Sequence, residues 1–174
     1  MKTWFFAVNF VLAVVFSYAV QANSIWFATE NSVQQLDNGT YQVVTTLPLS
    51  EVKALAVDAK DGSVLVLTKK KILKFSASGV NLLEKTLRDF GLGEGKQFAA
   101  NPYDGSVWIA SEKKLVRLDS QGRQLSAWSA QGQIKNIAIA LDESLWVLGE
   151  SQAWHYNPSG ALIESRSLYW FIEE

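Results

Sequence analysis

The chain has 174 residues, 48% of them hydrophobic, with 16 Lys and Arg residues against 17 Asp and Glu residues. This near-neutral balance excludes the concentrated basic surface on which nucleic-acid binding depends. The sequence has no cysteine and one histidine, His155, so disulfides, cysteine nucleophiles and multi-histidine metal centres are excluded. The composition is that of one globular domain with a hydrophobic core.

Residues 1–22 have the pattern of a secretory signal peptide. Lys2 is the only charge before Glu30, residues 4–16 form an apolar run, and a more polar segment suited to cleavage after Ala22 follows. The alternative is an uncleaved membrane anchor, but the run is short for a span of about 20 residues and no basic cluster follows it. We predict a secreted or periplasmic protein with no stable membrane span after cleavage, whose mature part is 23–174.

The mature sequence contains four copies of one repeat. Similar apolar segments begin at Ser24, Ser63, Ser106 and Ser144, which are 39, 43 and 38 residues apart. Each serine is followed by a turn glycine, 15 residues later in the first copy and 16 residues later in the other three. A period of about 40 residues with short apolar segments indicates the blades of a β-propeller.

Each full copy predicts four strands. The predicted ranges are 52–57, 63–67, 72–75 and 80–87 in the second copy, 97–100, 106–110, 115–118 and 123–129 in the third, and 134–140, 144–149, 153–156 and 161–167 in the fourth. The first two strands of a copy are nearly all apolar, which predicts burial on both faces. The last two alternate, which predicts an outer position. The first copy lacks the first strand, because Ser24 closely follows the cleavage site.

The predicted fold class is therefore all-β, a β-propeller of four-stranded antiparallel blades at about 24–47, 52–87, 97–129 and 134–167. The segments DGSVWIA at 104–110 and KLVRLDSQG at 114–122 resemble the repeats of NHL-type and related bacterial propellers. This resemblance covers the mature chain and implies a propeller, not one propeller family. No WD40 pattern occurs, and Glu30, Lys69, Glu112 and Glu150 stand where NHL blades usually have Asp.

Three interpretations of the blade number stay open. Residues 168–172 are apolar and would supply the missing strand of the first blade, which would close a four-bladed ring. Alternatively the chain is a truncated or N-terminal piece of a larger secreted repeat protein, and 168–174 begins a fifth blade. In the third interpretation the protein is a homo-oligomer, two copies of which share one eight-bladed ring.

Repeated residues are interpreted as structural. Trp26, Trp108 and Trp146 share one repeat position with Leu65, which predicts packing between blades, whereas Trp128, Trp154 and Trp170 break the repeat and are freer to have a function. The turn aspartates are expected to bond their own backbone rather than calcium; they are Asp58, Asp61, Asp104 and Asp142. We expect no metal and no cofactor.

The loop at 88–96 is the best candidate for an interaction site. It contains three glycines and is predicted to be exposed and flexible, on the face that also carries the turns between the second and third strands. The predicted binding residues are Arg88, Phe90, Glu94, Lys113 and Glu150.

The predicted function is that of a non-enzymatic binding or scaffold module for a protein or a cell-envelope polymer. The alternative is a lactonase-type propeller hydrolase, which holds a divalent metal with side chains of its innermost strands. Alanines predominate on these strands here and do not ligate metals; they are Ala54, Ala56, Ala99, Ala100, Ala138 and Ala140.

Overall fold

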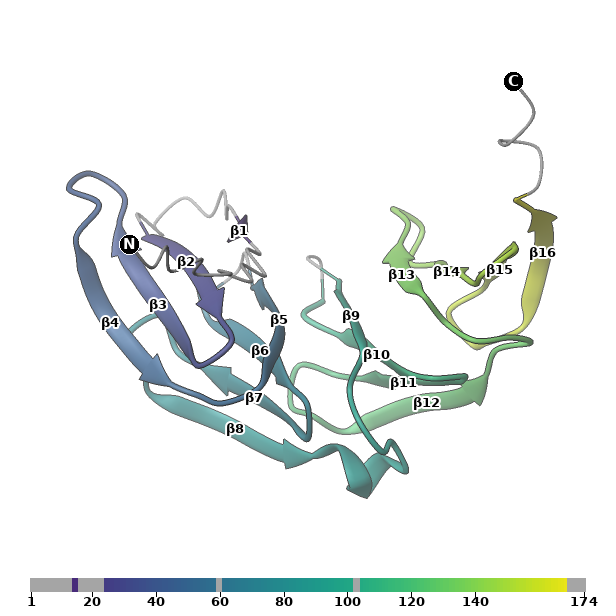
Figure 1. The fold of residues 1–174 in the computed structure, drawn as a ribbon, viewed down its shortest axis with the longest axis horizontal. Coiled ribbons are helices and arrows are strands. Elements are labelled where there is room, and N and C mark those ends of the chain that lie inside the picture. The colour runs from purple at the N-terminus through teal and green to yellow at the C-terminus, as the bar shows by residue number, and fades with distance from the viewer. Residues whose placement is uncertain (1–13, 16–23, 59–60, 102–103, 169–174) are drawn as a thin grey trace, which may run out of the picture.

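The computed structural model describes residues 14–15, 24–58, 61–101 and 104–168. These residues form four antiparallel sheets of four strands each, in which every strand pairs with its neighbours in sequence. Figure 1 shows the sheets following one another along an open arc, with the first and fourth sheets at its two ends. The predicted all-β propeller blades are therefore confirmed, and the blades form a partial propeller.

Each sheet is one blade, and its first strand lies at the inside of the arc. Blade 1 consists of β1 (Val14–Val15), β2 (Ser24–Thr29), β3 (Ser32–Asp37) and β4 (Val43–Pro48). Blade 2 consists of β5 (Val52–Val57), β6 (Val64–Thr68), β7 (Lys71–Phe75) and β8 (Asn81–Thr86). Blade 3 consists of β9 (Gln97–Ala100), β10 (Val107–Ser111), β11 (Lys114–Leu118) and β12 (Gln124–Ser129). Blade 4 consists of β13 (Asn136–Ile139), β14 (Leu145–Leu148), β15 (Gln152–Tyr156) and β16 (Leu162–Ser167).

The expectation that the first blade lacks an inner strand is wrong for the uncleaved chain, in which two residues of the predicted leader form this strand. Val14 pairs with Phe27, and Val15 pairs with Trp26. The inner edge of β2 would otherwise expose unpaired backbone N–H and C=O groups, and two β-branched residues suit a strand at that edge. The predicted closing strand at 168–172 lies outside the described residues, apart from Leu168, whose backbone N–H donates to the Ser151 carbonyl at 3.0 Å.

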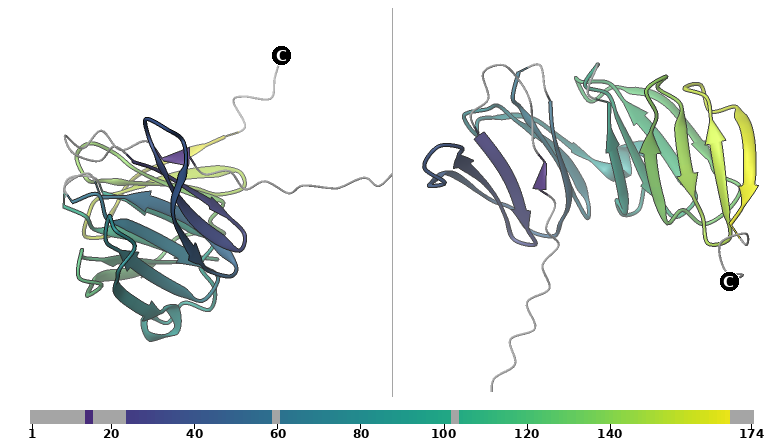
Figure 2. Two further views of the ribbon diagram at one scale, coloured as in Figure 1. Left: turned by 90° about the vertical axis from the view of Figure 1, so that its left-hand side faces the viewer. Right: turned by 90° about the horizontal axis from the view of Figure 1, so that it is seen from above.

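The hydrophobic core has three parts, and each part lies between two successive blades. Because side chains alternate between the two faces of a strand, each blade offers one apolar set to the preceding blade and another to the following blade. Between blades 2 and 3, for example, Leu65 and Leu67 pack with Val107 and Ile109. Figure 2 shows the blades packed face to face in succession along the arc.

A β-bulge recurs between the two outer strands of every blade. The register shifts after Gln35, Lys74, Arg117 and His155, which occupy one repeat position. The strand pairs that carry the bulges are the two outermost strands of each blade in Figure 1. Bulges interrupt the regular edge that an outermost strand would offer to another chain.

One helix occurs among the described residues, the 3₁₀-helix η1 (Leu87–Phe90) between β8 and β9. No helix in the described part of the chain is long and apolar enough to cross a membrane.

Candidate functional site

The predicted interaction loop between β8 and β9 is folded onto the core. Leu87 and Leu92 are 0% and 2% exposed, and Phe90 packs partly against the same cluster between blades 2 and 3. The predicted exposure is therefore wrong for Leu92. The reason is that the loop covers the end of an inter-blade core, so its apolar side chains face inward.

A lysine of the next blade fixes this loop. The Lys114 ammonium donates to the carbonyl of Phe90 at 2.8 Å and to that of Gly91 at 3.4 Å, at the C-terminal end of η1. Gly91 has a left-handed backbone with φ 67°, which glycine adopts without strain. A Cβ at this position would also displace the Lys114 ammonium from the two carbonyl groups.

Beside the fixed loop lies a polar hollow of about 330 Å³ at one end of blade 3, lined by this blade and by the connections that lead into and out of it. Its lining comes from the segment after η1, the β10–β11 turn and the connection from blade 3 to blade 4, and consists of Gly91, Leu92, Gly93, Ser111, Glu112, Lys113, Lys114, Ser129 and Gln133. Lys113 is exposed and, like Lys53, Lys70 and Lys85, has no acidic group within ion-pair distance among the described residues. Glu112 lines the same hollow and lies 3.8 Å from Lys96. The hollow therefore combines an exposed cation that forms no ion pair with a carboxylate that forms one.

The structure brings only one of the five predicted binding residues into this hollow, namely Lys113. Arg88 is exposed on η1 and Phe90 is half-buried. Glu94 is 3.1 Å from Lys69, and its hydrogen bond raises the pKa of that ammonium group. Glu150 lies in the β14–β15 turn, 3.9 Å from Lys135 of the same blade. The sequence does not distinguish the other lining residues from their neighbours, so only the folded arrangement of blade 3 and its connections identifies them.

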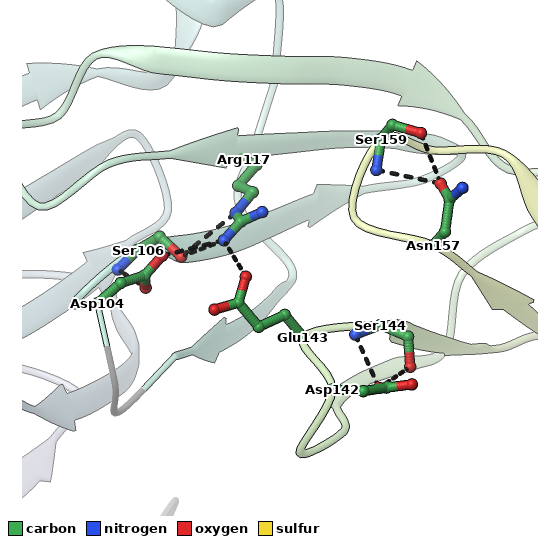
Figure 3. Close-up of polar contacts among 8 residues, drawn as sticks. All are labelled: Asp104, Ser106, Arg117, Asp142, Glu143, Ser144, Asn157 and Ser159. Atoms are coloured by element: carbon green, nitrogen blue, oxygen red, sulfur yellow. Dashed lines mark hydrogen bonds and ion pairs between the residues drawn. The ribbon is translucent and has the colours of Figure 1, made fainter.

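A second polar feature recurs in blades 2, 3 and 4, at the opposite ends of the strands. In blade 3, Asp104 accepts a hydrogen bond from the Ser106 backbone N–H at 2.8 Å and contacts Arg117 at 3.0 Å. Arg117 also donates to the Ser106 hydroxyl and, across the blade boundary, to Glu143 at 3.2 Å. Figure 3 shows this cluster and the related Asp142–Ser144 contact of blade 4.

The same three positions hold Asp61, Ser63 and Lys74 in blade 2, and Asp142, Ser144 and His155 in blade 4. In blade 1 the repeat position of Lys74, Arg117 and His155 holds the neutral residue Gln35, which donates to the Ala77 carbonyl of blade 2 at 3.0 Å. The turn interpretation of Asp61, Asp104 and Asp142 is confirmed, because each bonds the backbone N–H two residues later. The pairing with a strand residue was missed, although the constant Asp-x-Ser spacing is visible in the sequence.

These contacts keep the aspartates ionised. Burial by itself would raise the pKa of Asp61 and of Asp104. Hydrogen bonds from Ser63 and Ser106 and the charges of Lys74 and Arg117 outweigh this effect. The pKa of each aspartate is therefore lowered. The pKa of Asp142 is lowered chiefly by the hydrogen bond from the Ser144 hydroxyl. The carboxylates therefore act as fixed negative partners of the strand cations.

In blade 4 the contact resembles a Ser-His-acid triad. The His155 Nε2 lies 2.7 Å from the Ser144 Oγ, and the His155 Nδ1 lies 3.6 Å from Glu164. The Ser144 hydroxyl, however, donates its single proton to Asp142, so Nε2 is the donor toward Ser144. A hydrolase needs the opposite direction, with the imidazole accepting the serine proton. Ser144 is also 2% exposed, which leaves its oxygen out of reach of a substrate carbonyl.

Four of the described tryptophans, Trp26, Trp108, Trp128 and Trp154, belong to the inter-blade cores, whereas the predicted packing between blades is wrong for Trp146, which is half-buried and belongs to none of the three clusters. Trp26 and Trp108 are both 1% exposed, which confirms the packing interpretation of their shared repeat position. Trp154 is 4% exposed, and the Trp128 ring lies 4.5 Å from that of Trp108 in an edge-to-face contact. The expectation that these two are freer for function is wrong, because both fill the space between blades 3 and 4. Trp170 lies outside the described residues.

No cluster of three or more His, Asp or Glu side chains suited to a metal occurs among the described residues. Gln97 and Asn136 are the polar residues of the described inner strands β9 and β13, beside the alanines.

Four sheets of four antiparallel strands, packed face to face along an arc, define a partial β-propeller. The chain is similar to hydrazine synthase of Kuenenia stuttgartiensis (TM-score 0.73, 14% identity), the WD40 domain of Neurospora crassa Pan2 (0.71, 10%) and Sqt1 of Saccharomyces cerevisiae (0.72, 9%). These matches cover 89%, 88% and 88% of this chain, but 48%, 48% and 47% of theirs. No family model and no curated protein sequence matches the chain.

The chain thus has the propeller fold and spans about half the length of these propeller proteins. At such low identity the similarity concerns the fold alone, since propellers carry many unrelated functions.

Proposed function

We propose that this protein is an exported, non-enzymatic binding module that holds a protein or a cell-envelope polymer at the polar hollow at the end of blade 3. The observation that carries this proposal is the exposed Lys113 ammonium, which forms no ion pair among the described residues, in a hollow of about 330 Å³. Hydroxyl, amide and charged groups surround it, so the hollow suits a polar segment that bears a carboxylate or several hydroxyls.

The fixed loop supports this assignment. Lys114 holds Phe90 and Gly91 in place, and Leu87 and Leu92 anchor the loop in the core, so the wall of the hollow is formed before any partner arrives. A preformed site loses less conformational entropy on binding than a flexible loop. Propeller folds commonly serve as binding scaffolds, in line with the NHL-type blade resemblance of 104–122, and the leader pattern of residues 1–22 supports export.

The non-enzymatic part of the proposal rests on the Ser144–His155 contact, which among the described residues resembles a nucleophilic site. Ser144 is buried and donates to Asp142 rather than to His155. Blades 2 and 3 place lysine and arginine where blade 4 has His155. A position that accepts Lys, Arg and His in turn is best explained by a structural contact that any hydrogen-bond donor can make.

Photo-crosslinking in intact cells tests the binding site. The amino acid p-benzoylphenylalanine in place of Gln133, which lines the hollow, should yield a crosslinked partner. The same amino acid in place of Gln121, on an exposed turn at the opposite ends of the strands, should not. Glycosidase and protease treatment of the adduct distinguishes a polymer from a protein.

A charge reversal tests the role of the cation. Lys113→Glu should lower the crosslinking yield at Gln133 about tenfold or more, equivalent to about 1.4 kcal/mol. Arg123→Glu, on the opposite face, should leave the yield unchanged. Equal yields at Gln133 and Gln121, or a yield that Lys113→Glu does not change, would contradict the proposed site.

A further inference from the structure

The packing of the blades follows one rule within the chain. We call the face that a blade turns to the next blade its trailing face. In blade 2 this face consists of Leu65, Leu67, Ile72 and Lys74. We call the opposite face, which a blade turns to the preceding blade, its leading face. In blade 3 the leading face consists of Val107, Ile109, Val116 and Leu118. The same pairing of trailing with leading face joins blades 1 and 2, and blades 3 and 4.

The trailing face of blade 4 has no following blade among the described residues. By strand register it consists of Trp146, Leu148, Ala153 and His155. Leu148 is 39% exposed, whereas its counterparts Leu67 and Ala110 are both 0% exposed. Trp146 is half-buried and stacks on His155 with a ring distance of 4.3 Å. This face is therefore built like the buried ones but remains open.

The leading face of blade 1 is open in the same way. Its members are Ile25, Phe27, Gln34 and Leu36, and all four are half-buried. Their counterparts in blade 2, Val64 and Val66 among them, are 0 to 6% exposed. Three of the four side chains are apolar, as in the leading faces that the chain buries. Figure 1 shows blades 1 and 4, which carry these two faces, at opposite ends of the arc.

We propose that the trailing face of blade 4 packs against the leading face of blade 1 of a second copy, and that the reciprocal contact closes a ring of eight blades. The interface type already exists three times in the chain, and one unmatched face of each kind remains among the described blades. Two such contacts close under a two-fold axis and leave no open face. The chain spans 47–55% of four propeller proteins that it matches, so two copies have about the length of one such protein. This inference rests on the fold and is independent of the proposed binding site.

Light scattering after size-exclusion chromatography tests the assembly on the full-length gene product, with the mass of one chain measured by mass spectrometry. The expected result is a species of twice the chain mass. Leu148→Glu places a charge on the trailing face of blade 4 and should raise the dissociation constant about 100-fold or more. Leu36→Glu should do the same on the leading face of blade 1. Leu125→Glu, at a 54% exposed position on the outer strand β12, is the matched control and should leave the dimer intact.

Mixing the two variants distinguishes this assembly from other dimers. A Leu148→Glu copy and a Leu36→Glu copy can still form one unaltered contact, between the intact face of each, so the mixture should recover a dimer that neither variant forms alone. Circular dichroism checks that each variant is folded, and a misfolded Leu36→Glu is replaced by Ile25→Glu on the same face.

Three results overturn the proposal. One is a species with the mass of a single chain at every concentration. This result includes the case in which the gene product is longer and its further residues cover Trp146. Another is a dimer that Leu148→Glu does not weaken or that mixing does not restore. The last is an open series of higher oligomers, which would show that the two faces meet without closing a ring.

Discussion

At the residue scale, the main polar contact joins a turn aspartate, a serine and a strand donor in each of three successive blades. Arg117 is the best example, since its guanidinium contacts Asp104 and Ser106 in its own blade and Glu143 in the next. Its side chain is 11% exposed, so it needs these acceptors to offset the loss of water. The contact therefore fixes both the hairpin turn and the boundary between two blades.

This network predicts acid sensitivity. A carboxyl group whose pKa is lower in the folded than in the unfolded chain stabilises the fold above its unfolded pKa of about 4, and this stabilisation is lost as the pH falls through the folded value. The pKa values of Asp61, Asp104 and Asp142 are lowered. The melting temperature should therefore change little because of these groups between pH 7 and pH 5, and should fall below about pH 4.

Asp104→Asn checks the cause. The variant should lose about 1–2 kcal/mol of unfolding free energy at pH 7, because Arg117 loses a charged acceptor, and its melting temperature should fall less steeply in acid. Asp89→Asn, at an exposed position of η1, should behave like the unaltered protein. An acid transition that is the same in Asp104→Asn as in the unaltered protein would show that this carboxylate does not contribute.

At the scale of single elements, the repeat assigns strands better than it assigns loops. The outer strands all carry a bulge opposite the same repeat position, and the extra residue is an exposed aliphatic side chain in every blade: Val44 at 63%, Leu82 at 55%, Leu125 at 54% and Ile163 at 55%. These side chains explain why apolar and polar residues alternate imperfectly along the outer strands. The bulges protect the outer edges from pairing with another chain.

The loop between β8 and β9 shows why glycine content alone does not indicate mobility. Gly91 ends η1 in a left-handed conformation, and Gly95 has the Leu67 and Leu87 side chains within 2.9 Å of where a Cβ would lie. Gly91 and Gly95 thus allow close packing of the loop, whereas a Cβ at Gly93 would meet no atom within 4 Å.

A pair of substitutions tests this element. Leu92→Ala should lower the free energy of unfolding by about 2–5 kcal/mol, because it opens a cavity at a site that is 2% exposed. Arg88→Ala, on the exposed side of η1, should change it by less than about 0.5 kcal/mol. Urea unfolding measures both. A loss below about 1 kcal/mol for Leu92→Ala would mean that the loop is not part of the folded core.

At the scale of the whole molecule, stability comes from contacts between neighbouring blades. Each of the three cores joins only two blades, as in repeat proteins, where stability is approximately a sum of units and nearest-neighbour interfaces. Damage to one interface should therefore remain local.

Trp26→Ala and Trp108→Ala form a matched pair for this prediction, since both residues are 1% exposed at the same repeat position. By amide hydrogen exchange, Trp26→Ala should lose protection mainly in β2–β8 and Trp108→Ala mainly in β9–β16. Uniform loss along the whole chain in both variants would show instead that the arc unfolds as one cooperative unit.

The amino-acid sequence by itself determined the blades. Strand periodicity, turn glycines and the constant spacing of Ser24, Ser63, Ser106 and Ser144 are local properties, and they are sufficient to place four-stranded units and to assign Trp26 and Trp108 to the packing between them. The strand ends differ from the predicted ranges by a few residues, because the ends depend on which backbone groups find a partner.

Only the tertiary structure decided how these units combine. The hollow at Lys113, the contact from Arg117 to Glu143 and the burial of Leu92 and Trp154 all arise between blades or at the connections between them, from residues that lie about 20 or more positions apart or break the repeat. The open arc is a property of the same kind. Whether a blade turns its apolar face to a neighbour or to solvent depends on the angle between successive sheets, which comes from the sum of many side-chain contacts across each interface rather than from any local pattern.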